Sequence, residues 1–162
     1  MKITRELLRL WGACYNDERI ATLVPEAGLT PLEVAALDIP AEDRLWVLLR
    51  EDIIPARELR LLACDWAEAA CRKAGWNDAR SLAAIAVARR FAIGEATKSE
   101  LNAAGKAAWA ASRAAESATF AAASRAAESA AWSASREPEW AAWAAMISAS
   151  ASSPAAVRTA AS

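Results

Sequence analysis

Pairs of charged residues are the first candidates for chemistry in this chain, because paired carboxylates can act as general acid and base. Asp65 and Glu68 lie three residues apart on one predicted helix, but Glu68 also precedes Arg72 by four residues, the spacing of a surface ion pair. The chain contains no histidine, so the commonest general base and metal ligand is missing. It also has no glycine-rich phosphate loop and no GxSxG turn. We therefore expect a protein that is not an enzyme, with no metal and no cofactor.

Tryptophan and arginine supply the candidate binding residues. The chain has eight tryptophans, which in the simplest interpretation add bulk between helices that alanine cannot fill. Trp140 and Trp143, beside Arg136, could instead form an exposed aromatic and cationic patch, of the kind that forms a protein hot spot or stacks on a nucleobase. The arginines in the middle of the chain, with Arg50 and Arg89 as the leading candidates, could hold an anionic nucleotide, although ion pairs with nearby acidic residues are the simpler role. The pairs Arg113/Glu116 and Arg125/Glu128 have the spacing of solvated helix pairs, and alternatively they could form part of a binding face.

Charge and hydropathy exclude several classes of partner. The net charge is -1, whereas proteins that bind duplex nucleic acid normally have a basic excess. No run of about 20 strongly apolar residues is present, so we expect no membrane span. The N-terminus has charges within its apolar stretch, which is not typical of a signal peptide. The odd set Cys14, Cys64 and Cys71 indicates buried, reduced thiols, and we expect a cytoplasmic protein.

The elements that must position these residues are helices with clear start and stop signals. Thr4 and Asn16 can cap two short helices, and Thr30-Pro31-Leu32-Glu33 is a capping box with proline at the first helical position. A helix over 41–52 should direct Leu45, Trp46, Leu48 and Leu49 inward. Pro55 should begin, and Gly75 end, a longer helix with Leu59, Leu62, Trp66 and Cys71 in its buried stripe. Asn77 or Asp78 can cap the next helix, which should end at Gly94, and a second capping box, Thr97 to Glu100, follows it.

From about Leu101 the sequence is dominated by alanine, with the segment from Ser112 to Ala118 repeated at Ser124 to Ala130. Alanine is the best helix former and projects only a methyl group, so we expect long helices that pack closely. The repeat has a period of 12 residues, which turns its marked face by about 120° in a straight helix, so the tract is not a single amphipathic stripe. Gly105 and Lys106 mark one candidate break, and Pro138 marks another.

Several segments together resemble a family of alanine-rich helical proteins from bacteria and phages, some of which carry an immunity-protein label. They are Trp46 to Pro55, Leu59 to Glu68 and Ala79 to Ala104, preceded by Trp11-Gly12-Ala13-Cys14. Within the family's most specific motif, Ser81 stands where proline is typical, and the matching residues are Asp78, Arg80, Ala84, Ile85, Phe91, Gly94 and Glu95. The resemblance implies an all-helical fold and a role in conflict between bacteria and phages. It supplies no catalytic residues.

These observations predict a single all-α domain over 1–162. It should contain a bundle of short helices over 1–96, alanine-rich helices over 97–152 and a tail over 153–162. The leading functional hypothesis is a non-catalytic immunity or anti-defence protein that neutralises a toxin or a defence component by covering its surface. Sequestration of a small anionic nucleotide is the first alternative. A structural module, in which alanine faces of two copies pair into a homo-oligomer, is the second.

Overall fold

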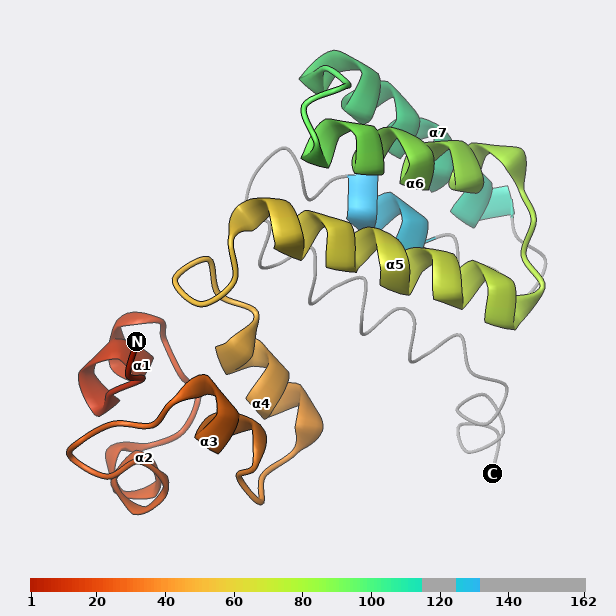
Figure 1. Ribbon diagram of the computed structural model, residues 1–162. Helices are drawn as coiled ribbons and strands as arrows, with labels where there is room; N and C mark the ends of the chain where they lie inside the picture. Colours follow the sequence, from red (N-terminus) through yellow and green to blue (C-terminus); the bar gives the residue numbers. More distant parts are fainter. Residues whose placement is uncertain (115–124, 132–162) are drawn as a thin grey trace, which may run out of the picture. The chain divides into compact units, whose positions relative to one another are not determined.

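The computed structural model describes residues 1–114 and 125–131, and it confirms the all-α prediction (Figure 1). The chain forms two compact units, Met1–Ile54 and Pro55–Ser162, which we call the N-terminal unit and the alanine-rich unit. Residue 96, where we expected the short helices to give way to alanine-rich ones, therefore falls inside the second unit. Within the described residues there is no β-strand; Ile3 and Leu29 form a single isolated antiparallel bridge.

Four short helices form the N-terminal unit, and local caps begin three of them. They are α1 (Arg5–Leu10), α2 (Asp17–Leu23), α3 (Pro31–Ala35) and α4 (Ala41–Leu48). The side chains of Thr4 and Asn16 accept hydrogen bonds at the starts of α1 and α2. Thr30 and Glu33 form the predicted capping box at α3. Each cap satisfies backbone N–H groups that would otherwise have no partner, so helices too short to persist alone begin at defined residues.

Large aliphatic side chains fill the core of the N-terminal unit. Its buried members are Ile3, Leu8, Ile20, Val24, Leu29, Val34 and Val47. The bridge between Ile3 and Leu29 passes against Gly28, where a Cβ would lie 3.0 Å from the Ile3 carbonyl oxygen. Gly28 also has a φ of +70°, so both its conformation and its surroundings favour glycine.

The helix over 41–52 is shorter than predicted. It ends at Leu48, and its buried positions are Val47 and the following Leu49, whereas Leu45, Trp46 and Leu48 are half-buried. Leu49 leaves the helical conformation at a ψ of 45°, which turns the chain before Arg50.

Three longer helices dominate the described part of the alanine-rich unit: α5 (Ala56–Ala74), α6 (Ala79–Ala92) and α7 (Lys98–Ala114). Residues 125–131 are also helical. As predicted, Gly75 closes α5 in the left-handed conformation and Asp78 caps α6, whereas α6 ends at Ala92, two residues before the predicted Gly94. Thr97 and Glu100 exchange capping hydrogen bonds at the start of α7. Helix α6 packs against both α5 and α7 (Figure 1).

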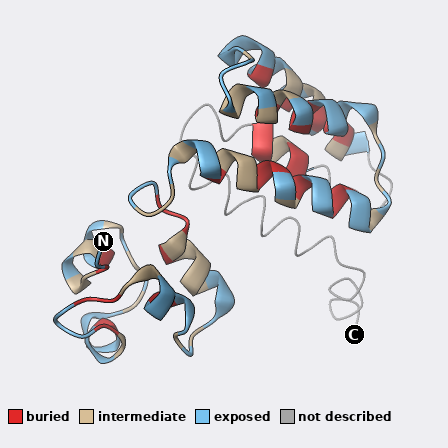
Figure 2. Ribbon diagram, in the orientation of Figure 1, coloured by how far each residue is buried: buried red, intermediate tan, exposed pale blue. Residues whose placement is uncertain are grey.

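Small side chains form most of the interior of this unit, and buried segments recur along α5, α6 and α7 between exposed ones (Figure 2). The fully or almost fully buried small residues are Ala63, Cys64, Ala67, Ala70, Cys71, Ala84, Ala88, Ala108, Ala111, Ala126, Ala127, Ala130 and Ala131. Among the predicted stripe residues of α5, Leu59 and Cys71 are buried, whereas Leu62 and Trp66 are half-buried. Methyl-sized side chains let helix backbones approach closely, as the composition predicted.

The predicted break at Gly105 and Lys106 is wrong, because α7 runs through both residues. Gly105 lies on the buried face of the helix with Leu101, Ala108 and Ala111. Packing of that face offsets the roughly 1 kcal/mol that glycine costs within a helix. The predicted break at Pro138 and the tail over 153–162 lie outside the described residues.

Candidate functional site

Arg50, a predicted anion-binding residue, lies over two tryptophan rings of the N-terminal unit. Its guanidinium carbon is 3.9 Å from the ring centroid of Trp46 and 5.3 Å from that of Trp11. Its Nε donates a hydrogen bond to the Trp46 carbonyl oxygen at 3.2 Å. Arg50 is only 8% exposed, so its guanidinium makes cation–π contacts within the unit and presents little charge to solvent.

Carboxylates of the same unit engage the neighbouring aromatic groups. The Trp11 indole donates to Asp52 at 3.2 Å, and the Tyr15 hydroxyl donates to Asp43 at 2.6 Å. The hydrogen bond to Asp43 raises the pKa of Tyr15 above its ordinary value. These long-range contacts connect α1 and the segment after it to α4 and to the turn that follows α4.

Arg89, the other predicted anion-binding residue, forms two ion pairs across α5 and α6. Its Nη1 donates to Asp65 at 2.8 Å, and its Nη2 donates to Glu68 at 2.9 Å. The hydrogen bond to Asp65 raises the pKa of the guanidinium, which stays charged. Two carboxylates three residues apart lie on one side of α5, where a single arginine of α6 reaches both. This arrangement confirms the predicted pairing with acidic neighbours for Arg89, but the expected Glu68–Arg72 pair is wrong, since the structure pairs Glu68 with Arg89.

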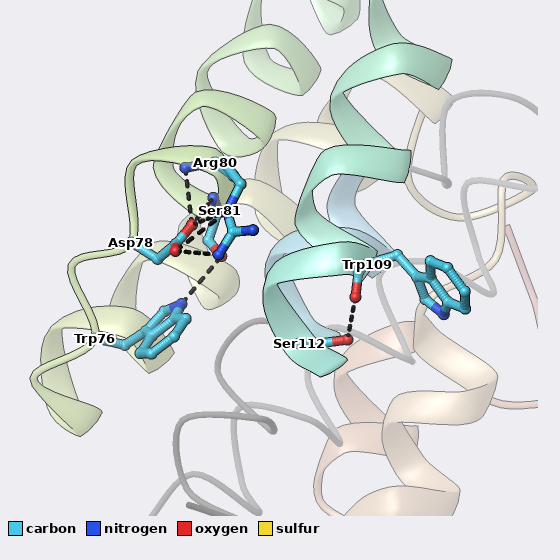
Figure 3. Close-up of polar contacts among 6 residues, drawn as sticks. All are labelled: Trp76, Asp78, Arg80, Ser81, Trp109 and Ser112. Carbon is cyan, nitrogen blue, oxygen red and sulfur yellow. Dashed lines mark hydrogen bonds and ion pairs between the residues drawn. The ribbon is translucent and has the colours of Figure 1, made fainter. Parts of the chain in front are cut away.

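Ser81 takes part in a polar cluster at the start of α6 (Figure 3). Its side chain is fully buried and accepts a hydrogen bond from the Trp76 indole at 3.0 Å. Asp78 accepts hydrogen bonds from the backbone N–H groups of Arg80 and Ser81, and it pairs with the Arg80 guanidinium at 2.7 Å. Ser81 therefore connects Trp76 to the start of α6.

Trp109 is the one large aromatic side chain of the described residues that is classed as exposed. It is 48% exposed and extends away from α7 (Figure 3). The Arg113 guanidinium carbon lies 5.1 Å from its ring centroid, so the pair forms an aromatic and cationic surface. The predicted surface of this type, Trp140, Trp143 and Arg136, lies outside the described residues. From the sequence, Arg113 was considered together with Glu116 and was not paired with Trp109, although the spacing of four residues between Trp109 and Arg113 on a helix was a usable signal.

The cysteines differ from the prediction in one respect. Cys64 and Cys71 are buried, whereas Cys14 is exposed, and none of the three forms a disulfide. Burial raises the pKa of Cys64 to about 12 and that of Cys71 to about 11, which disfavours their thiolates. Cys14 lies in the short connection between α1 and α2.

The two predicted pairs of the alanine repeat have different outcomes. Glu116 lies outside the described residues, so its pair with Arg113 stays a prediction. Glu128 is half-buried, and burial raises its pKa while the charge of Arg125 acts in the opposite direction. The repeat therefore places one of its acidic side chains against the alanine-lined interior.

No protein-family model, curated protein or solved structure matches this chain. In the described part of the chain, no helix is long and apolar enough to span a bilayer. Over residues 1–114 and 125–131, no group of three or more histidine, cysteine or acidic side chains could hold a metal ion.

Proposed function

We propose that this chain is a non-catalytic binding protein that neutralises a toxin or a defence component by covering part of its surface. The observation that supports the proposal most directly is the exposure of Trp109. This side chain is 48% exposed on a helix whose opposite face is packed into the alanine-rich unit. Tryptophan and arginine are the residues most enriched in protein hot spots, and Trp109 lies under Arg113. The resemblance to alanine-rich immunity-labelled proteins favours the same role.

A rigid support strengthens this interpretation. Helix α7 begins at a capping box and packs against α6, so the indole is presented from a regular helix. A side chain on such a support loses little conformational entropy when it binds, which favours affinity.

Sequestration of an anionic nucleotide receives less support. That alternative needs arginines that present their charge to a ligand, whereas Arg89 already pairs with Asp65 and Glu68. Arg50 is 8% exposed and lies over two indole rings. A nucleotide would have to displace these intramolecular partners before it could bind.

The alternative of a structural module predicts a homo-oligomer formed through alanine faces. Light scattering of the purified protein separates it from the leading proposal, because a homo-oligomeric module should have a defined mass above that of the 17.2 kDa monomer.

The decisive experiment is co-expression of the chain with each product of the flanking genes in a growth assay. The proposal predicts that one of these products is toxic or restricts phage growth, and that the chain restores growth while forming a stoichiometric complex with it. Trp109→Ala should weaken the restoration, whereas Trp76→Phe, a change at an internally hydrogen-bonded tryptophan, serves as the matched control. If the chain restores growth against none of these products and forms no complex with them, the proposal is wrong.

A further inference from the structure

The outer face of α7 carries a pattern of side chains that its packing does not explain. Between Asn102 and Ala114, the exposed residues of this helix are Asn102, Ala103, Lys106, Trp109, Ala110, Arg113 and Ala114. Lys106 precedes Trp109 by three residues and Arg113 follows it by four, so the two cations flank the indole on one side of the helix. We call these three residues the α7 face.

The charge of the α7 face is unbalanced. The sequence from Leu101 to Ala114 contains no aspartate or glutamate. Within the described ranges, neither Lys106 nor Arg113 forms an ion pair. Three other exposed arginines do form ion pairs: Arg9 with Asp17, Arg80 with Asp78, and Arg90 with Glu100. Glu116, the predicted partner of Arg113, lies outside the described residues. Among the described residues, two cations without a carboxylate partner lie on either side of an exposed indole, an arrangement that is complementary to an acidic surface.

We propose that the α7 face binds an acidic segment of a partner protein, with a carboxylate at each cation and an apolar pocket that receives the Trp109 indole. This inference rests on the proposed function and specifies the chemistry of the partner. Ala103, Ala110 and Ala114 are also exposed on α7 and project only methyl groups, so a partner backbone can approach the helix closely. Desolvation of the indole at the centre of the contact supplies affinity, and the flanking charges supply orientation.

A nucleic acid is the less favoured anionic partner. Binding along a phosphate backbone normally uses a series of basic contacts, whereas the α7 face has two. The whole chain has a net charge of -1, and the N-terminal unit carries six Lys and Arg against ten Asp and Glu. An acidic unit in the same chain disfavours binding of a long polyanion.

The test uses the full-length chain with isotope-labelled tryptophan, whose eight indole N–H groups can be followed separately by NMR. Trp109→Phe identifies the Trp109 signal by its loss. The probe is an acetylated helical peptide built from the repeat Leu-Glu-Glu-Ala, and the controls are the same peptide with lysine or glutamine in place of glutamate. We expect the acidic peptide to shift the Trp109 signal in a saturable manner, and the lysine and glutamine peptides to leave it in place.

Two matched variants test the role of charge. Lys106→Ala/Arg113→Ala should weaken binding of the acidic peptide by about tenfold, because two partly exposed charge pairs are lost. Arg72→Ala/Lys73→Ala removes the same net charge from exposed positions on α5 and should leave the affinity unchanged. Circular dichroism of both variants checks that the helices are intact.

Three outcomes would overturn the inference: no shift of the Trp109 signal with the acidic peptide, an equal shift with the lysine peptide, or tighter binding of a single-stranded oligonucleotide than of the acidic peptide. Failure of the proposed function has a different signature. If the chain forms no complex with any flanking gene product but the acidic peptide still binds at Trp109, the proposed function is wrong. The inference that the α7 face binds an acidic segment is then retained. If the chain protects cells and the Lys106→Ala/Arg113→Ala variant protects equally well, the inference is wrong and the function stands.

Discussion

The two compact units bury side chains of different size. In the N-terminal unit, short capped helices surround isoleucine, leucine and valine side chains. In the alanine-rich unit, longer helices bury mainly alanine, with Cys64 and Cys71 among them. Short helices present few residues to a core, so each buried residue must contribute volume. Long helices contact one another over many turns, so the sum of many methyl contacts can stabilise them.

This difference determines how each unit should respond to substitution. A core of large side chains is sensitive to truncation, because removed atoms leave a cavity. An interior of alanine is sensitive to enlargement, because closely spaced backbones leave no room for more atoms. The predictions below test this contrast.

The largest expected contrast concerns the thiols. Cys14 in the N-terminal unit is exposed, whereas burial raises the pKa of Cys64 in the alanine-rich unit to about 12 from the ordinary 9.0. This shift alone lowers the thiolate fraction of Cys64 by about a thousandfold at neutral pH. We expect a thiol reagent to modify one cysteine rapidly in the native protein and all three in denaturant, as counted by mass spectrometry. The Cys14→Ser variant is the control and should show no rapid phase of thiol modification. Rapid modification of Cys64 or Cys71 in the native protein would contradict the burial of these two thiols.

Truncation in the N-terminal unit should have the next largest effect. Ile20 is 2% exposed, and Ile20→Ala should lower the free energy of unfolding by about 2–5 kcal/mol. Leu10→Ala is the control, since Leu10 is 81% exposed and its loss should change stability by less than about 0.5 kcal/mol. Chemical denaturation, with hydrogen exchange resolved over residues 1–54, measures both. Equal effects of the two variants would show that the aliphatic core does not stabilise this unit.

Enlargement in the alanine-rich unit should have a somewhat smaller effect. Ala67 is fully buried on α5, and Ala67→Leu should lower the free energy of unfolding by about 1–3 kcal/mol through overpacking. Ala69 is exposed on the same helix, so Ala69→Leu should be nearly neutral. Thermal unfolding followed by circular dichroism compares the two variants. If Ala67→Leu is neutral or stabilising, the helices of this unit are not closely packed at that position.

The smallest expected effect is a dependence on pH at the start of α6. Hydrogen bonds from Arg80 and from backbone N–H groups lower the pKa of Asp78 below its ordinary 3.8. A carboxylate with a lowered folded pKa stabilises the protein above its unfolded pKa, and this contribution is lost as the pH falls through the folded pKa. Asp78→Asn keeps a capping oxygen but has no titrating group, so its stability should vary less below pH of about 4 than that of the wild type. Denaturation at neutral and acidic pH measures this difference. Asp38→Asn, at an exposed position, is the control, and an identical pH profile for Asp78→Asn and the wild type would contradict the role of Asp78.

Local rules predicted the boundaries of the helices well but predicted their interactions poorly. The capping boxes at Thr30 and Thr97 and the helix end at Gly75 depend on residues within a few positions of one another, so the sequence contains all the information they need. The predicted helix break at Gly105 is wrong because the low helix propensity of glycine costs little free energy compared with the packing of the buried side of α7 that contains it. The predicted Glu68–Arg72 pair is wrong because residue spacing predicts only partners on the same helix, whereas Arg89 lies on another helix.

For the candidate site too, the sequence predicted the residue types but not their contacts. Composition alone indicated that tryptophan and arginine would supply any binding surface. It could not distinguish Arg50, which lies over Trp46 within the N-terminal unit, from Arg113, which accompanies an exposed Trp109. Exposure depends on which side of each helix meets its neighbours, and those contacts join residues far apart in the sequence.

The sequence by itself determined that the chain is helical and where most of its described helices begin and end, because backbone propensity and capping act over a few residues. Only the tertiary structure decided that the two units bury side chains of different size and that Trp109 remains exposed. Burial is a property of packed surfaces, and the same tryptophan can fill a core or face a partner according to what lies beside it.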